Sequence, residues 1–198
     1  MNMMGKIAGV YVPQYLKKRE LKNLFDMTAT AFGATTVQTS GLSYERMLDE
    51  YARFTSTVIS KSVNELHNLG TARQQLCRQA YTVGNNIRER LGVISISDIM
   101  TACRIVYRCI GIDFEGTETG EITIRRCFFS KYYSDQACGI ISCLDKGLVA
   151  GISKGGKLSF VQRITDGSDC CKAQFIPRES VHEIGDRGGY RCWWCDCS

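Results

Sequence analysis

The chain has 198 residues, of which 44% are hydrophobic and 23% are charged, with a formal net charge of +5. This composition is typical of a soluble globular protein, and no apolar run reaches the ~20 residues that a membrane-spanning helix needs. The basic residues are scattered, with the densest groups at 17–19 and 125–126, whereas a nucleic-acid binder concentrates them on one face. We therefore expect neither a membrane nor a nucleic-acid partner.

The eleven cysteines are an unusual feature of this composition. The first residues, MNMMGKIAGVYVP, contain no clear signal-peptide cleavage site, so we expect a cytoplasmic protein. In that reducing compartment a disulfide framework is not expected. Free thiols, catalysis or metal binding are the better interpretations of the cysteines.

The first half of the chain predicts four helices, because apolar residues recur every three or four positions. These stripes cover residues 21–32, 44–59, 69–91 and 99–110. Gly33, Gly92 and Gly111 follow three of the stripes, as is common at helix ends. Ser43 and Ser97 precede two of them and are the expected N-caps.

Beyond Gly111 the pattern changes from helices to strands. EITIRRC (121–127) predicts a strand, residues 137–151 predict a helix, and residues 158–165 and 170–176 predict a hairpin around Asp166-Gly167. The expected fold is α+β, with N-terminal helices (1–111) packed on a small antiparallel sheet (112–177) that ends in a C-terminal hairpin. These parts form one expected domain, 1–177, followed by a cysteine-rich tail, 178–198.

Periodicity also predicts which thiols face the interior. In the last strand Cys171 shares the apolar face, and Cys170 takes the outer one. In the helix over 137–151, Cys138 and Asp145 lie on one edge of the apolar stripe, whereas Cys143 points the other way. Cys138 and Cys171 should therefore approach a common cavity. The alternative is that both are small buried hydrophobes, which is common for free cysteines.

The same segments carry a resemblance to a known family. The pattern IVYRCIGIDFE, EITIRRC, ACGIISCLDKGL and GSDCCKAQF resembles the L-2-amino-thiazoline-4-carboxylic acid hydrolase family, which is similar in its C-terminal half to the four-vinyl-reductase small-molecule-binding domains. The resemblance covers about residues 65–177. This chain has Phe128 where members often carry proline, and its QRITDGSD stretch lacks the cysteine and glutamate of the zinc-binding members. No zinc site is carried over from them.

The resemblance implies a hydrolase that opens a small heterocyclic substrate, of thiazoline or cyclic-amidine type, in a pocket between the helices and the sheet. Ring opening needs a nucleophile at the amidine carbon, and a thiolate of Cys138 or Cys171 could attack it, with Asp145 at the pocket margin. Alternatively, Cys127, Cys138 and Cys171 with Asp145 could hold a metal that activates water. Arg125 is the candidate for binding the substrate carboxylate, with Cys127 beside it.

Cys192, Cys195 and Cys197 form a CxxCxC run in the tail. Such spacing suits zinc or an iron-sulfur cluster, so the tail is a second candidate metal site. Two other functions stay open. One is a non-catalytic small-molecule-binding module, and the other is a thiol or metal redox protein built around the tail. The substrate, the cofactor and the oligomeric state are left open by the sequence.

Overall fold

The computed structural model describes residues 12–64 and 69–178. Its helices are α2 (Gln14–Phe32), α3 (Tyr44–Asn64), α4 (Leu69–Leu91), α5 (Ile96–Arg108), α6 (Asp135–Ile141) and α7 (Cys143–Ile152). Its strands are β1 (Ile112–Gly116), β2 (Glu121–Cys127), β3 (Lys157–Gln162) and β4 (Cys171–Ile176), and two 3₁₀ turns are η1 (Phe128–Lys131) and η2 (Ile164–Asp166). The four strands form one antiparallel sheet in the order β1-β2-β4-β3. The predicted α+β class is confirmed. Within the described ranges, no helix combines the length and apolar character needed to span a bilayer.

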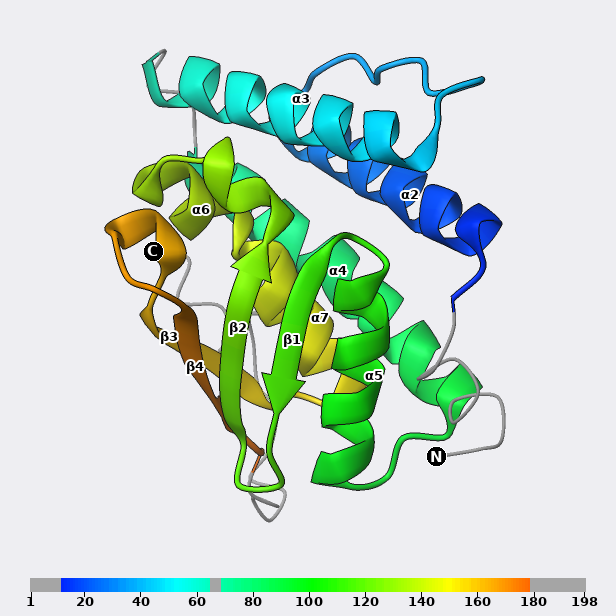
Figure 1. The fold of residues 1–198 in the computed structure, drawn as a ribbon, viewed down its shortest axis with the longest axis vertical. Helices are drawn as coiled ribbons and strands as arrows, with labels where there is room; N and C mark the ends of the chain where they lie inside the picture. The colour runs from blue at the N-terminus through cyan, green and yellow to red at the C-terminus, as the bar shows by residue number, and fades with distance from the viewer. Residues whose placement is uncertain (1–11, 65–68, 179–198) are drawn as a thin grey trace, which may run out of the picture.

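The elements form layers behind one face of the sheet (Figure 1). Helix α7 lies behind β1 and β2, α4 lies beyond α7, and α2 and α3 cross the end where β2 finishes. One core fills the space between the sheet and α4, α5 and α7, and a second joins α2 and α3 to α6 and η1. The outer face of the sheet is more exposed than the inner face, as the alternating burial along β4 shows.

Three predicted boundaries were wrong. The helix expected over 137–151 is two helices that meet at Ser142, whose hydroxyl donates to the Gly139 carbonyl at 2.8 Å. The strand expected to reach residue 165 ends at Gln162, because a bulge follows Phe160 and the η2 turn begins two residues later. The N-cap of α5 is Ser95 and not Ser97. Ser95 Oγ accepts from the Asp98 N–H at 3.1 Å, and Asp98 accepts from the Ser95 N–H at 3.2 Å.

Helices α4 and α7 touch through their backbones. A Cβ atom added to Gly147 would lie 2.1 Å from the Cys77 carbonyl oxygen, and one added to Gly151 would lie 2.2 Å from that of Tyr81. From the other side, a Cβ on Gly84 would lie 2.3 Å from the Leu148 carbonyl oxygen. The close crossing therefore requires glycine at all three positions, since backbone atoms cannot turn away as a side chain can.

Cys143 belongs to the same contact. It lies four residues before Gly147, on the α7 face that packs on α4, and it is fully buried. The prediction that it points away from Asp145 and Cys138 agrees with this placement. Its role is that of a small residue in a helix seam, and not that of a surface thiol.

The seam gives a stability prediction with a matched control. Gly147→Ala should lower the free energy of unfolding by about 2–3 kcal/mol, because the added methyl overlaps backbone atoms. Gly139→Ala in α6 should leave stability unchanged or raise it by up to ~1 kcal/mol, since that position has open space and alanine favours helix. Urea unfolding followed by circular dichroism measures both. Equal stability of the two variants would contradict the seam.

Candidate functional site

Asp145 occupies the α7 face opposite the glycine seam. The Tyr107 hydroxyl on α5 donates to Asp145 Oδ1 at 2.7 Å, and the Tyr107 ring stacks on Phe114 of β1 with 4.9 Å between centroids. Burial raises the pKa of Asp145 to about 6, although the Tyr107 hydrogen bond and the charge of Arg163 act in the opposite direction. Burial also raises the pKa of Tyr107 well above its usual value, so its hydroxyl stays a donor. The result is a carboxyl that titrates close to neutral pH.

A β-bulge brings Cys127 to the inner face of the sheet. Asp113 pairs with Arg126 and Phe114 pairs with Ile124, so Arg125 is the extra residue of β2. Arg125 and Arg126 are both exposed, and Cys127 then turns back to the interior, where it is half-buried. Simple alternation predicts that Cys127 and Arg125 share one face of the strand, and the bulge makes this prediction wrong.

Three thiols lie within electrostatic range of Asp145: Cys127 at the end of β2, Cys138 on α6 and Cys171 at the start of β4. A charge on Asp145 raises the pKa of each, and a charge on Cys171 raises the pKa of Cys127 and Cys138. Burial is the largest cause of the raised values and takes Cys127 to a pKa of about 12. All three are therefore neutral thiols at pH 7. We call Asp145, Tyr107 and these thiols, with Arg163, the Asp145 cluster.

Two groups support a negative charge on the Cys171 sulfur. The Ile164 N–H donates to its Sγ at 3.4 Å, and both this contact and the charge of Arg163 lower its pKa against the effect of burial. Cys171 is 8% exposed, whereas Cys170 lies on the other face of β4, next to Gln162. These two faces agree with the predicted alternation.

Arg163 is the member of the cluster that the sequence did not reveal. It follows β3 directly, and its charge lowers the pKa of Asp145, Cys138 and Cys171. Its Nε is buried and makes no hydrogen bond within the described residues, while Nη2 lies 3.5 Å from Ser142 Oγ. The guanidinium carbon also lies 4.7 Å from the Phe160 ring centre. The only signal in the sequence is its position just before the turn that leads to Cys171.

Arg125, the expected substrate-binding arginine, is not part of the cluster. Its side chain is 59% exposed on the outer face of the sheet and forms an ion pair with Glu115. Arg125 thus lies away from Asp145, whose charge acts on Cys127, Cys138 and Cys171. Arg163 holds the position facing these groups that Arg125 was expected to hold.

The expected metal site at Cys127, Cys138, Cys171 and Asp145 is not formed. Among the described residues, no three histidine, cysteine or acidic side chains are grouped closely enough to hold a metal ion. Cys192, Cys195 and Cys197 lie outside the described residues. We assign no metal ion to the Asp145 cluster.

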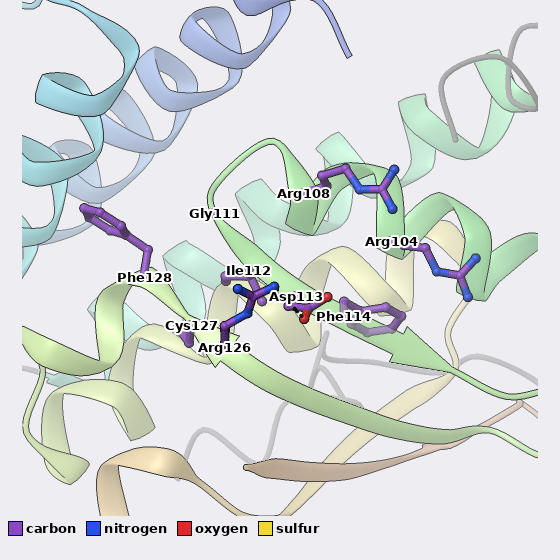
Figure 2. Close-up of a pocket in the computed structure, with 9 residues that line it drawn as sticks. All are labelled: Arg104, Arg108, Gly111, Ile112, Asp113, Phe114, Arg126, Cys127 and Phe128. Atoms are coloured by element: carbon purple, nitrogen blue, oxygen red, sulfur yellow. Dashed lines mark hydrogen bonds and ion pairs between the residues drawn. The ribbon is translucent and has the colours of Figure 1, made fainter. Parts of the chain in front are cut away.

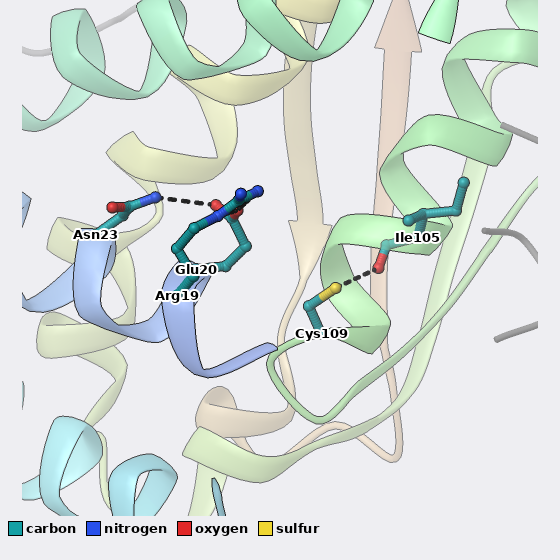
Figure 3. A network of polar contacts seen from close by, with 5 residues as sticks. All are labelled: Arg19, Glu20, Asn23, Ile105 and Cys109. Carbon is teal, nitrogen blue, oxygen red and sulfur yellow. Dashed lines mark hydrogen bonds and ion pairs between the residues drawn. The ribbon is translucent and has the colours of Figure 1, made fainter. Parts of the chain in front are cut away.

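The remaining described thiols have packing roles. Cys77 and Cys103 are almost fully buried, and Cys103 lies near Asp145 with a pKa that burial raises to about 12. Cys109 donates its thiol hydrogen to the Ile105 carbonyl at 3.1 Å, next to Glu20 of α2 (Figure 3). Burial raises the Cys109 pKa to about 11. This thiol is held as a donor to a helix carbonyl.

A groove of about 430 Å³ lies between α5 and the β1–β2 pair (Figure 2). Its lining includes Arg104, Arg108, Asp113, Arg126 and Cys127. The pocket expected between helices and sheet was to be bordered by Cys138, Cys171 and Asp145, and none of these three lines this groove. Cys127 is the residue that it shares with the Asp145 cluster.

Comparison with known proteins gives no relative. No family model, no curated protein and no solved structure matches this chain. We therefore infer the function from the geometry of the site.

The raised pKa of Asp145 predicts a pH dependence of stability. The folded state holds this proton more tightly than the unfolded chain, whose carboxyl titrates near its ordinary pKa of 3.8. The associated stability is present in full below that value and is lost as the pH rises through about 6. Relative to Asp145→Asn, the wild type should lose up to about 3 kcal/mol between about pH 4 and pH 7.

Urea unfolding at both pH values measures this difference. Asp169→Asn, which removes an exposed carboxylate next to Cys170, is the control for losing one ionisable group. The prediction is refuted if the free energies of unfolding of wild type and Asp145→Asn differ by the same amount at both pH values.

Proposed function

We propose that the Asp145 cluster is the active site of a hydrolase that opens a small heterocyclic substrate of the thiazoline or cyclic-amidine type. The observation that carries this proposal is the placement of Asp145, with a pKa of about 6, among inward thiols beside a buried guanidinium. A carboxyl that titrates near neutrality can act both as base and as acid. The resemblance of residues 65–177 to thiazoline-carboxylate hydrolases gives the substrate class.

Cys171 is the proposed nucleophile. Its sulfur adds to the amidine carbon of the ring while its proton passes to Asp145. The Ile164 N–H and Arg163 stabilise the negative charge that develops on the sulfur. The ring C–N or C–S bond then breaks, and the departing atom takes the proton from Asp145. Attack of water on the carbon bound to Cys171, with Asp145 again as base, releases the product and restores the thiol.

The proton transfer from Cys171 to Asp145 is unfavourable, but its free-energy cost is small compared with the barrier lowering that enzymes achieve. The ordinary thiol pKa of 9.0 exceeds the Asp145 value of about 6, and burial widens the gap. A difference of three units corresponds to about 4 kcal/mol, which is small beside the ~8 kcal/mol or more by which enzymes lower barriers. Unassisted water, with a pKa of 15.7, would be a much poorer proton donor. Thiol attack is therefore the better supported route.

Arg163 is the proposed partner of the substrate carboxylate. Its buried Nε has an unused hydrogen, and a guanidinium binds a carboxylate with two parallel hydrogen bonds. The Phe160 ring against its guanidinium carbon restricts how the side chain can turn. Arg163 thus orients the ring relative to Cys171 and Asp145.

A second candidate is a non-catalytic small-molecule-binding module. It is favoured by one observation, which is that burial keeps every thiol of the cluster protonated at neutral pH. A neutral, sulfur-lined interior suits an apolar ligand as well as a reaction. For either function we infer a cytoplasmic location, because the eight cysteines of the described residues are all free thiols.

The test is turnover of a panel of thiazoline carboxylates, thiohydantoins and cyclic amidines by purified protein. Cys171→Ser should lower kcat by about 10²-fold or more, because serine is a poorer nucleophile. Cys170→Ser, which changes the neighbouring outward thiol, should stay within about twofold of wild type. In the wild type, kcat/KM should fall below about pH 6 as Asp145 gains its proton and ceases to be a base.

These measurements separate the two candidates. Saturable binding of panel compounds with no turnover identifies the binding module. Full activity of Cys171→Ser would rule out Cys171 as the nucleophile. A kcat/KM that does not change around pH 6 would rule out Asp145 as the base.

A further inference from the structure

The groove between α5 and β1 carries an excess of positive charge. Arg104 and Arg108 lie one turn apart on α5, and Arg126 faces them from the end of β2. Figure 2 shows the two α5 side chains on the same side of the helix, with Arg126 beside Asp113. Three guanidinium groups and a single carboxylate therefore line this groove.

Asp113 neutralises little of this charge. Its Oδ2 lies 3.5 Å from Arg126 Nη2, and the Arg126 side chain is 86% exposed, so the pair is loose and solvated. Arg104 makes no hydrogen bond or ion pair within residues 12–64 and 69–178. Two like charges spaced four residues apart on one helix face repel each other.

The groove also has the size of a ligand site. Its volume of about 430 Å³ is within the ~300–1,000 Å³ range of small-molecule pockets. Beside the arginines it contains Phe114, which stacks on Tyr107 and so gives the groove a rigid floor. Rigid walls with convergent donors reduce the ordering cost of binding.

We propose that this groove binds a small phosphate-bearing anion, with Arg104, Arg108 and Arg126 as its ligands. The lining holds three arginines and one aspartate, and a phosphate monoester or diphosphate carries about two negative charges at neutral pH. A phosphate also offers more acceptor oxygens to several arginines than a single carboxylate does. Guanidinium forks bind phosphate oxygens in bidentate fashion, which suits a groove that arginines of α5 and β2 line together. The proposal uses no residue of the catalytic step at Asp145 and Cys171.

The test is calorimetric titration with pyrophosphate and inorganic phosphate at low ionic strength, where such contacts are least screened. Pyrophosphate should bind saturably. Arg104→Gln should weaken that binding about tenfold or more, because one charged hydrogen-bonding partner is lost. Arg78→Gln, which removes an exposed arginine of α4, should stay within about twofold. Thermal unfolding of both variants checks that they are folded.

Several outcomes overturn the proposal. One is the absence of saturable pyrophosphate binding to wild type. Another is an equal loss in Arg78→Gln, which would mean a diffuse charge effect. Citrate that binds as tightly as pyrophosphate would make the site a carboxylate site. A DNA duplex that binds through Arg104 while pyrophosphate does not would make the groove a nucleic-acid surface.

Discussion

The backbone contact between α4 and α7 is the constraint on which the rest of the site depends. Glycine at 84, 147 and 151 lets the two helices meet with no side chain between them. Such a contact fixes the rotation of α7, because only one face of the helix lacks side chains. Asp145 lies two positions from both Cys143 and Gly147, about 200° around the helix. The seam on one side of α7 therefore dictates that Asp145 faces α5 and the sheet on the other.

The members of the Asp145 cluster that come from the sheet lie at or beside its irregular parts. The bulge at Arg125 turns Cys127 inward, and the η2 turn places the Ile164 N–H and Arg163 beside Cys171. Regular strands would have offered alternating side chains at fixed intervals and no free backbone donor for a thiol. The functional groups thus come from positions where regular pairing ends, which is common where a strand must aim a side chain.

Periodicity was sufficient to predict the fold class and the faces of the regular segments. It separated Cys171 from Cys170 and Cys143 from Asp145, because each pair lies within one helix or strand. It could not predict the bulge, since an added residue changes the phase of Cys127 without any change in composition. Arg163 was missed for a related reason: its importance comes from the η2 turn and not from a repeat. The N-cap at Ser95 could have been predicted from the sequence, because Asp98 lies three residues later and forms a capping box with it.

The charge of Arg163 contributes to the electrostatics of the Asp145 cluster at several of its members. Asp145 is the one carboxylate among neutral thiols, and Arg163 is the nearby arginine whose charge lowers its pKa. Without Arg163 the burial of Asp145 would be opposed only by the Tyr107 hydroxyl and the charge of Lys146, and the carboxyl would hold its proton to higher pH. A substrate carboxylate on Arg163 would partly cancel that charge and shift Asp145 in the same direction. Substrate binding would then itself favour the protonated form of Asp145, which is the form that the proposed thiol attack produces when the Cys171 proton moves to this carboxylate. Occupancy of Arg163 would thus make Asp145 a stronger base for the first proposed step.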